Sequence, residues 1–263
     1  MALPNYDYVV FTNAPVSLAL GQVKFPILPR FGEAGFIAEF QEAIRSEYPR
    51  ISRERQIALQ LSMEEVKQDI GGMLWRFADR SNLLSVVVGE NAITIEAQGY
   101  SSIEDFLSRF QRILSVASQT MGVSERTRLG LRYINELRHP DAKRFADWRR
   151  LLNPQFVDFK VSDLLVGDVE RTLAEMQVRC IDGTLTIRHG LLTGTAIRPV
   201  TQSPQTDEPF YLIDLDYYDT TEQELDIHAT IAQMRKYNGD LYRFFRWTLS
   251  DELFGYMEPK NAT

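Results

Sequence analysis

Three closely spaced arginines form the first group in this sequence whose chemistry suggests a function. Arg126, Arg128 and Arg132 occur in the stretch RTRLGLRYINELRHP, where leucines are interleaved with them. Because alternate side chains of a β-strand point to opposite faces, we expect all three arginines on one face and the leucines towards a core. Gly130 leaves a gap between them through which a phosphate, a base or a peptide backbone can approach.

Two ways of neutralising this arginine face are open. A guanidinium forms paired hydrogen bonds with carboxylates and phosphates alike. Acidic groups such as Glu96 and Glu136 would turn the face into an internal ion-pair surface, whereas an unpaired face would bind an anion or a partner. The candidates for anion or partner binding are Arg126, Arg128, Arg132 and Asn135.

Two aspartates in the stretch FYLIDLDYYD form a second candidate group. Asp214 and Asp216 are two positions apart, so both fall on one face of the expected strand. Such a pair can hold a divalent cation or act as an acid and a base, which makes a metal-dependent hydrolase the second alternative function. Arg179 and Arg188 of the preceding hairpin offer cross-strand ion pairs, and we expect this structural use of the aspartates.

The other reactive residue types predict no catalytic site. The three histidines, His139, His189 and His228, lack the spacing of a helical zinc site, and we expect structural roles for them. No nucleophile elbow, Walker A or dinucleotide-binding motif is present. The single cysteine, Cys180, excludes an internal disulfide, and we expect it to be packed beside Val178. We expect no cofactor, and an enzyme is the less favoured interpretation.

Aromatic residues are dense near the end of the sequence, in the stretch KYNGDLYRFFRWTLSDELFGYM. They occupy more than one side of the expected helix, and such a helix must be buried on more than one side. Homodimerisation or docking to a partner protein would provide the extra cover. The candidates for this interface are Tyr242, Phe245, Trp247, Phe254 and Tyr256.

The periodicity of apolar residues predicts the elements that carry these groups. Alternation predicts strands at 15–25, 57–61, 73–78, 83–88, 92–97, 126–137, 176–192 and 210–219. Helical spacing predicts helices at 36–48, at 103–121 and from 220 onwards, the last two with capping-box pairs Ser101–Glu104 and Thr220–Gln223. We also expect a bulge at Gly21, a two-residue turn at Asp182-Gly183 and a weak point of the last helix at Asn238-Gly239.

Runs of strands followed by a long helix predict the α+β class. The pattern of a strand and then a capped helix occurs twice, as AITIEAQGYSSIEDFLSRF and as FYLIDLDYYDTTEQELDIH. We therefore expect two antiparallel sheet-and-helix halves, residues 1–140 and 166–263, joined by a connecting segment at 141–165. An internal duplication is one explanation of the repeated pattern.

Composition restricts the class of partner. A formal charge of −7 and a pI near 5.2 disfavour general nucleic-acid binding, which normally relies on a basic domain. The first residues lack the basic-then-apolar order of a signal peptide, and no apolar run is long enough for a membrane span. We expect a cytoplasmic protein that makes no use of a membrane.

Several blocks together resemble a sporadically distributed bacterial protein family of about this length and of unknown function. They are NAPVSLALGQVKFP, a helix ending in YP, GYSSIEDFLSRF and RLGLRYINEL, and the family's hallmark is the LRYIN block at 131–135. The likeness extends from about residue 13 to residue 256. No catalytic residues are established for the family, so the resemblance transfers none. Its patchy distribution implies a mobile or conflict-related role, such as phage defence or a toxin–antitoxin pair.

Taken together, these features favour a non-enzymatic binding or regulatory subunit of a multicomponent bacterial system. It would act by protein recognition, with another protein of the same operon or a second copy as the partner. The first alternative is a nucleic-acid- or nucleotide-binding protein that uses the face of Arg126, Arg128 and Arg132.

Overall fold

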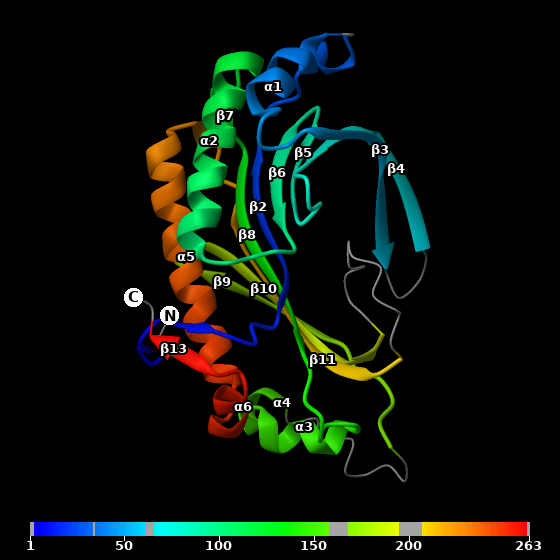
Figure 1. The fold of residues 1–263 in the computed structure, drawn as a ribbon, viewed down its shortest axis with the longest axis vertical. Coiled ribbons are helices and arrows are strands. Elements are labelled where there is room, and N and C mark those ends of the chain that lie inside the picture. Colours follow the sequence, from blue (N-terminus) through cyan, green and yellow to red (C-terminus); the bar gives the residue numbers. More distant parts are fainter. Residues whose placement is uncertain (1–2, 34, 62–65, 158–167, 195–206, 262–263) are drawn as a thin grey trace.

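The computed structural model describes residues 3–33, 35–61, 66–157, 168–194 and 207–261, with 55–61, 66–71 and 261 described by their backbone alone. These residues form an α+β fold, as predicted, in which helices pack on a large antiparallel sheet (Figure 1). No described helix is both long and apolar enough to cross a membrane.

The central sheet has nine strands in the order β3-β4-β5-β6-β2-β8-β11-β10-β9, and every neighbouring pair is antiparallel. Its strands are β2 (Val16–Lys24), β3 (Arg50–Leu61), β4 (Val66–Ala78), β5 (Leu84–Gly89), β6 (Ala92–Ala97), β8 (Arg128–Leu137), β9 (Ala174–Cys180), β10 (Gly183–Thr193) and β11 (Pro209–Asp219). Two short ribbons accompany it: β1 (Val9–Phe11) with β13 (Pro259–Asn261), and β7 (Glu125–Arg126) with β12 (Gln223–Glu224).

Three helices lie on one side of the sheet: α1 (Phe36–Ile44), α2 (Ile103–Met121) and α5 (Ile227–Thr248) (Figure 1). At one end of the molecule lie α3 (Phe145–Leu151), α4 (Pro154–Val157) and α6 (Asp251–Tyr256), and a 3-10 helix spans Pro29–Gly32. The helical side of the sheet holds the core because the apolar stripes of α2 and α5 face the apolar positions of the strands.

The helix caps lie later in the chain than the sequence predicts. Ser102, not Ser101, caps α2 by accepting a hydrogen bond from the Asp105 backbone N–H at 3.2 Å, and Gly122 ends the helix with φ 71°, as expected. Asp226 caps α5, so the predicted start at Thr220–Gln223 is wrong. Gln223 and Glu224 form β12 instead, because they pair with β7.

The structure also differs from the sequence prediction at three expected irregularities. Asn238-Gly239 is continuous α5 helix, and the hairpin turn consists of Ile181 and Asp182, since Cys180 pairs with Gly183. The irregularity of β2 lies between Val16 and Leu18, not at Gly21. A Cβ at Gly21 would lie 3.0–3.2 Å from Met234, Phe106 and Ile95, so the missing side chain lets α2 and α5 approach the sheet.

One hydrophobic core extends through both predicted halves. It unites Phe77 and Phe110 with Tyr211 and Phe245, and β8 of the first half pairs with β11 of the second. The halves therefore build one sheet and share its main core. The expected connecting segment contributes α3 and α4, and its residues 158–165 lie outside the described part of the chain. Each half has a hairpin followed by a long helix, and the duplication stays a prediction.

Candidate functional site

The two faces of β8 have different environments. Leu129, Leu131 and Tyr133 are buried on the helical side of the sheet. Arg128 and Arg132 lie on the opposite face, where β11 presents Asp214 and Asp216. We call this side of β8, β10 and β11 the charged face, and no helix of the described residues covers it (Figure 1).

The centre of the charged face is an arginine–aspartate network. Arg132 donates from Nε to Oδ1 of Asp214 at 2.7 Å and from Nη2 to Oδ2 at 2.6 Å, a bidentate pair. Arg188 reaches the same carboxylate at 3.5 Å and Glu175 at 2.5 Å. The predicted cross-strand pairing is confirmed for Arg188, whereas Arg179 has no ion pair with a described residue.

Arg128 fills the space that the sequence assigned to a ligand. A Cβ on Gly130 would lie 2.5 Å from Nη1 of Arg128, so the guanidinium lies directly over this glycine. There it donates to Gln22 at 2.9 Å, pairs with Asp216 at 3.4 Å and stacks on Tyr218. The expected gap for a phosphate or base at Gly130 is therefore closed by the protein itself.

The acidic groups expected to neutralise these arginines have other partners. Glu96 accepts a hydrogen bond from the Arg76 guanidinium at 2.5 Å, and Glu54 accepts one from the same guanidinium at 2.8 Å. These three residues form a second network on the same side of the sheet. Glu136 pairs with Arg138 at 3.0 Å. Internal pairing of the arginine face is thus present, but aspartates on β11 provide it.

Burial and the neighbouring charges act in opposite directions on the pKa values of this network. Burial alone would lower the pKa of Arg132, but its hydrogen bonds to Asp214 raise that pKa above the ordinary value. Burial raises the pKa of Asp216 despite the nearby Arg128 and Arg132. The aspartates face guanidinium groups, which repel a cation, and no group of three metal-ligating residues occurs in the described ranges. This arrangement favours the structural use of Asp214 and Asp216 that the sequence analysis expects.

Arg126 does not belong to the charged face, contrary to the prediction. The alternation stops at Thr127, because β7 and β8 are separate strands with different partners. Arg126 is only 2% exposed and donates to Asp219 at 2.8 Å, beside Gln233 and Tyr237 of α5. It is a buried link between β7, β11 and α5.

The chain itself covers most of the aromatic residues expected at a protein interface. Phe11 packs on Phe245 and Phe254, with ring centroids 6.3 and 5.7 Å apart. Trp247 packs on Phe156 of α4, and Tyr256, still 43% exposed, lies against His139. The N-terminal residues and α4 thus provide part of the cover that the sequence analysis assigned to a partner, and Phe245 is buried by the chain itself. The interface at the other candidates stays a prediction.

Tyr242, the remaining member, fastens the N-terminal segment. Its hydroxyl accepts from the Val9 backbone N–H at 3.0 Å and donates to the Asp7 carbonyl at 2.8 Å. We expect Tyr242→Phe to lower the free energy of unfolding by about 1 kcal/mol, because both bonds are lost. Hydrogen exchange at the Val9 amide should accelerate, whereas Tyr256→Phe should leave it unchanged. An unaltered Val9 exchange rate in Tyr242→Phe would contradict this role.

The histidines and the cysteine have no catalytic arrangement in the described structure. His189 lies on the apolar side of β10, where Nδ1 is 2.8 Å from the Tyr211 hydroxyl and the ring stacks on Phe156. His228 is exposed in the first turn of α5. Cys180 is half-buried on the edge strand β9, whose Val178 is exposed, so the expected burial is only partial.

His189 makes stability depend on pH. Burial lowers its pKa to about 4, below the value of about 6.5 in an unfolded chain. As the pH falls, the unfolded state therefore binds the proton first. The contribution of His189 to the free energy of unfolding is full above about pH 6.5 and is lost as the pH falls towards about 4. Allowing for partial exposure, we expect a loss of about 1 kcal/mol between pH 7 and pH 5 in urea titrations. His189→Gln should remove this loss and His228→Gln should retain it; equal pH dependence in both variants would refute the assignment.

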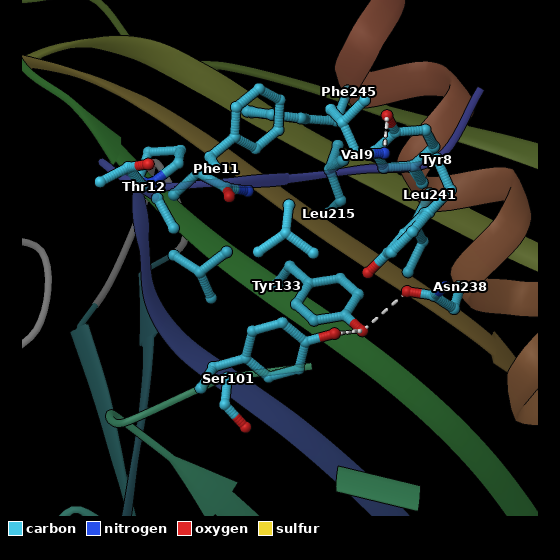
Figure 2. A pocket seen from close by; sticks show the side chains of 17 residues that line it. Tyr8, Val9, Phe11, Thr12, Ser101, Tyr133, Leu215, Asn238, Leu241 and Phe245 are labelled. Atoms are coloured by element: carbon cyan, nitrogen blue, oxygen red, sulfur yellow. Dashed lines mark hydrogen bonds between the residues drawn. The ribbon is translucent and has the colours of Figure 1, made fainter. Parts of the chain in front are cut away.

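A pocket on the helical side brings together residues that no motif connects. It lies between the N-terminal segment 8–12, α5, and strands β8 and β11 (Figure 2). Asn135, Tyr242 and Phe245, three of the sequence candidates, line it, although they were assigned to two different surfaces. Tyr8, Tyr100 and Asn238 were missed, because they are far apart in the sequence and only the fold makes them neighbours.

Comparison with known proteins identifies no relative: no family model, curated protein or solved structure matches this chain. The likeness to a sporadic bacterial family stays a prediction, and function has to be inferred from the geometry alone.

Proposed function

We propose that this chain is a non-enzymatic binding protein that recognises a partner protein through the charged face. The partner belongs to the same bacterial system, in keeping with the defence or toxin–antitoxin setting that the sequence resemblance implies, and the complex forms in the cytoplasm. The supporting observation is the alternation of paired arginines and aspartates on a sheet face that no described helix covers.

The balance of charge favours a protein over a nucleic acid. Arg128, Arg132 and Arg188 each have a carboxylate partner. A polyanion would have to displace these carboxylates, and the chain carries a formal charge of −7. A protein surface with both signs can instead add complementary charges around an existing network, which gives specificity rather than raw affinity.

Partial exposure of the arginines leaves them available to a partner. The side chains of Arg132 and Arg188 are 37% and 32% exposed, whereas Asp214 between them is 4% exposed. The buried Asp214 carboxylate therefore fixes the guanidinium groups of Arg132 and Arg188, and the exposed parts of these groups face solvent. Rigid donors of this kind suit an interface, since little side-chain freedom is lost on binding.

Site-specific photo-crosslinking in the native host tests the proposal. A photoreactive residue at Gln177, exposed on the charged face beside Tyr218, should capture one defined protein. The same residue at Lys236, exposed on the outer side of α5, is the matched control and should not capture it. The purified partner should then bind Arg188→Glu at least about tenfold more weakly than the parent.

Two results would contradict the proposal. One is capture of the same protein from Lys236 but not from Gln177. The other is equal affinity of the partner for the parent and for a folded Arg188→Glu variant. Capture of RNA or DNA from Gln177 instead would support the nucleic-acid alternative.

A further inference from the structure

The pocket on the helical side is a built cavity of about 320 Å³. The N-terminal segment crosses over β8 and β11 and closes one side, while α5 closes another (Figure 2). A cavity of this size fits a small organic molecule of one or two rings. It lies on the opposite side of the sheet from the charged face, so its occupant would be independent of the proposed partner.

The walls of the cavity are aromatic and uncharged. None of the described lining residues is acidic or basic, which disfavours a charged ligand. Aromatic walls favour flat ligands, which can stack on a ring or meet its edge. The rings that line the cavity are those of Tyr8, Phe11, Tyr100, Tyr133, Tyr242 and Phe245.

A chain of hydrogen bonds holds one wall in place. The Tyr100 and Tyr133 hydroxyls are 3.2 Å apart, and Tyr133 donates to Oδ1 of Asn238 at 2.9 Å (Figure 2). Burial raises the pKa of both tyrosines, so their hydroxyls stay protonated at neutral pH. The wall therefore offers fixed, neutral hydrogen-bonding groups.

Two amides that line the cavity, those of Asn135 and Asn238, each have one end without a hydrogen-bond partner among the described residues. Asn135, 3% exposed, donates from Nδ2 to the Ile213 carbonyl at 3.0 Å, and its Oδ1 accepts from no described residue. Asn238, 9% exposed, accepts from Tyr133, and its Nδ2 donates to no described residue. Both line the cavity. Neither end is among the fully buried atoms that lack a partner, so both are accessible, and a ligand or water in the cavity can bind them.

We propose that this cavity binds an uncharged planar ring that carries an amide-type donor and acceptor. This chemistry is shared by free nucleobases and by aromatic lactams. Asn238 would offer an N–H donor and Asn135 a carbonyl acceptor to the polar groups of the ring, and the aromatic side chains would cover its faces.

Titration calorimetry and saturation-transfer NMR on the full chain test this assignment. The probes are hypoxanthine and uracil as nucleobases, 2-quinolone as a lactam, quinoline, which has an acceptor nitrogen but no N–H or carbonyl, and indole, which has an N–H but no carbonyl. We expect an amide-bearing ring to bind at least about tenfold more tightly than quinoline and indole. Inosine monophosphate should bind no more tightly than hypoxanthine, because no described lining residue is cationic. Preference for the nucleobases or for 2-quinolone distinguishes the two sources.

Variants of the lining residues test whether the probes bind in the cavity. Asn135→Leu and Asn238→Leu should each weaken binding at least about tenfold, whereas Asn91→Ala, in the distant turn between β5 and β6, should not. Ala14→Trp, at an exposed lining position, should block the cavity without disturbing the core, and it serves if the asparagine variants do not fold. Absence of binding to the folded parent at millimolar concentration would overturn the proposal. Equal binding of quinoline or indole, or unchanged binding by Ala14→Trp, would also overturn it.

Discussion

Asp219→Ala is expected to lower the free energy of unfolding by about 3–5 kcal/mol, because it leaves a buried guanidinium without its counter-charge. Arg126 and Asp219 are 2% and 7% exposed, and their charged atoms are 2.8 Å apart. The Asp219 carboxylate also lies 3.1 Å from the Tyr237 hydroxyl and accepts from the Thr221 backbone N–H at 2.7 Å. Its removal therefore loosens the contact between β7, β11 and α5. Urea unfolding followed by far-ultraviolet circular dichroism measures the loss.

A surface pair provides the control for this experiment. Glu47 and Arg112 are also 2.8 Å apart, but their side chains are 34% and 50% exposed. We expect Glu47→Ala to change stability by no more than about 1 kcal/mol. The double variant Arg126→Met with Asp219→Leu should recover much of the loss, since apolar residues of similar size often replace a buried pair without penalty. Equal losses in Asp219→Ala and Glu47→Ala would contradict the importance of burial.

The buried Arg126–Asp219 pair also makes the stability of the protein depend on pH. Burial alone would raise the pKa of Asp219, but hydrogen bonds from Arg126 and Thr221 hold it below the ordinary value. A depressed carboxyl pKa stabilises the fold above the unfolded value of about 3.9. This contribution is lost as the pH falls through the folded pKa, so Asp219→Ala should show a weaker loss of stability in strong acid than the parent.

Asp214→Ala is expected to destabilise the protein by about 2 kcal/mol and to create an affinity for polyanions. Asp214 is the carboxylate that Arg132 and Arg188 share, and its own side chain is 4% exposed. The arginines are about one third exposed, so water relieves part of the loss. Without Asp214 their guanidinium groups become free for sulfate or phosphate groups. Elution from immobilised heparin at higher salt than the parent measures this gain.

Glu175→Ala is the matched control on the charged face. It removes the same charge, but Glu175 is 58% exposed and, among the described residues, forms an ion pair only with Arg188. We expect a change in stability of less than about 1 kcal/mol and a smaller shift in heparin elution. If the parent already binds heparin as strongly as Asp214→Ala, the charged face is open to polyanions, and the nucleic-acid alternative replaces the proposed protein recognition.

Local patterns in the sequence were sufficient for the fold class and for much of the polarity of the sheet. Alternation in RLGLRYINEL places Leu129 and Leu131 towards the helices and Arg132 away from them, because the strand repeat acts at short range. The stripe of α2 and its end at Gly122 follow from helical spacing for the same reason. The pairing of Asp214 with Arg188 was predictable because a hairpin places neighbouring strands side by side.

Partners that come from distant parts of the chain were decided by the tertiary structure alone. Arg126 changes sides because β7 pairs with β12, a contact that spans nearly a hundred residues and leaves no local signal. The N-terminal segment covers Tyr242 and Phe245 because β1 pairs with β13 at the other end of the chain. The same contacts create the aromatic cavity. A sequence pattern records which side of an element is apolar, but hydrophobic burial is non-directional and does not specify which segment covers that side.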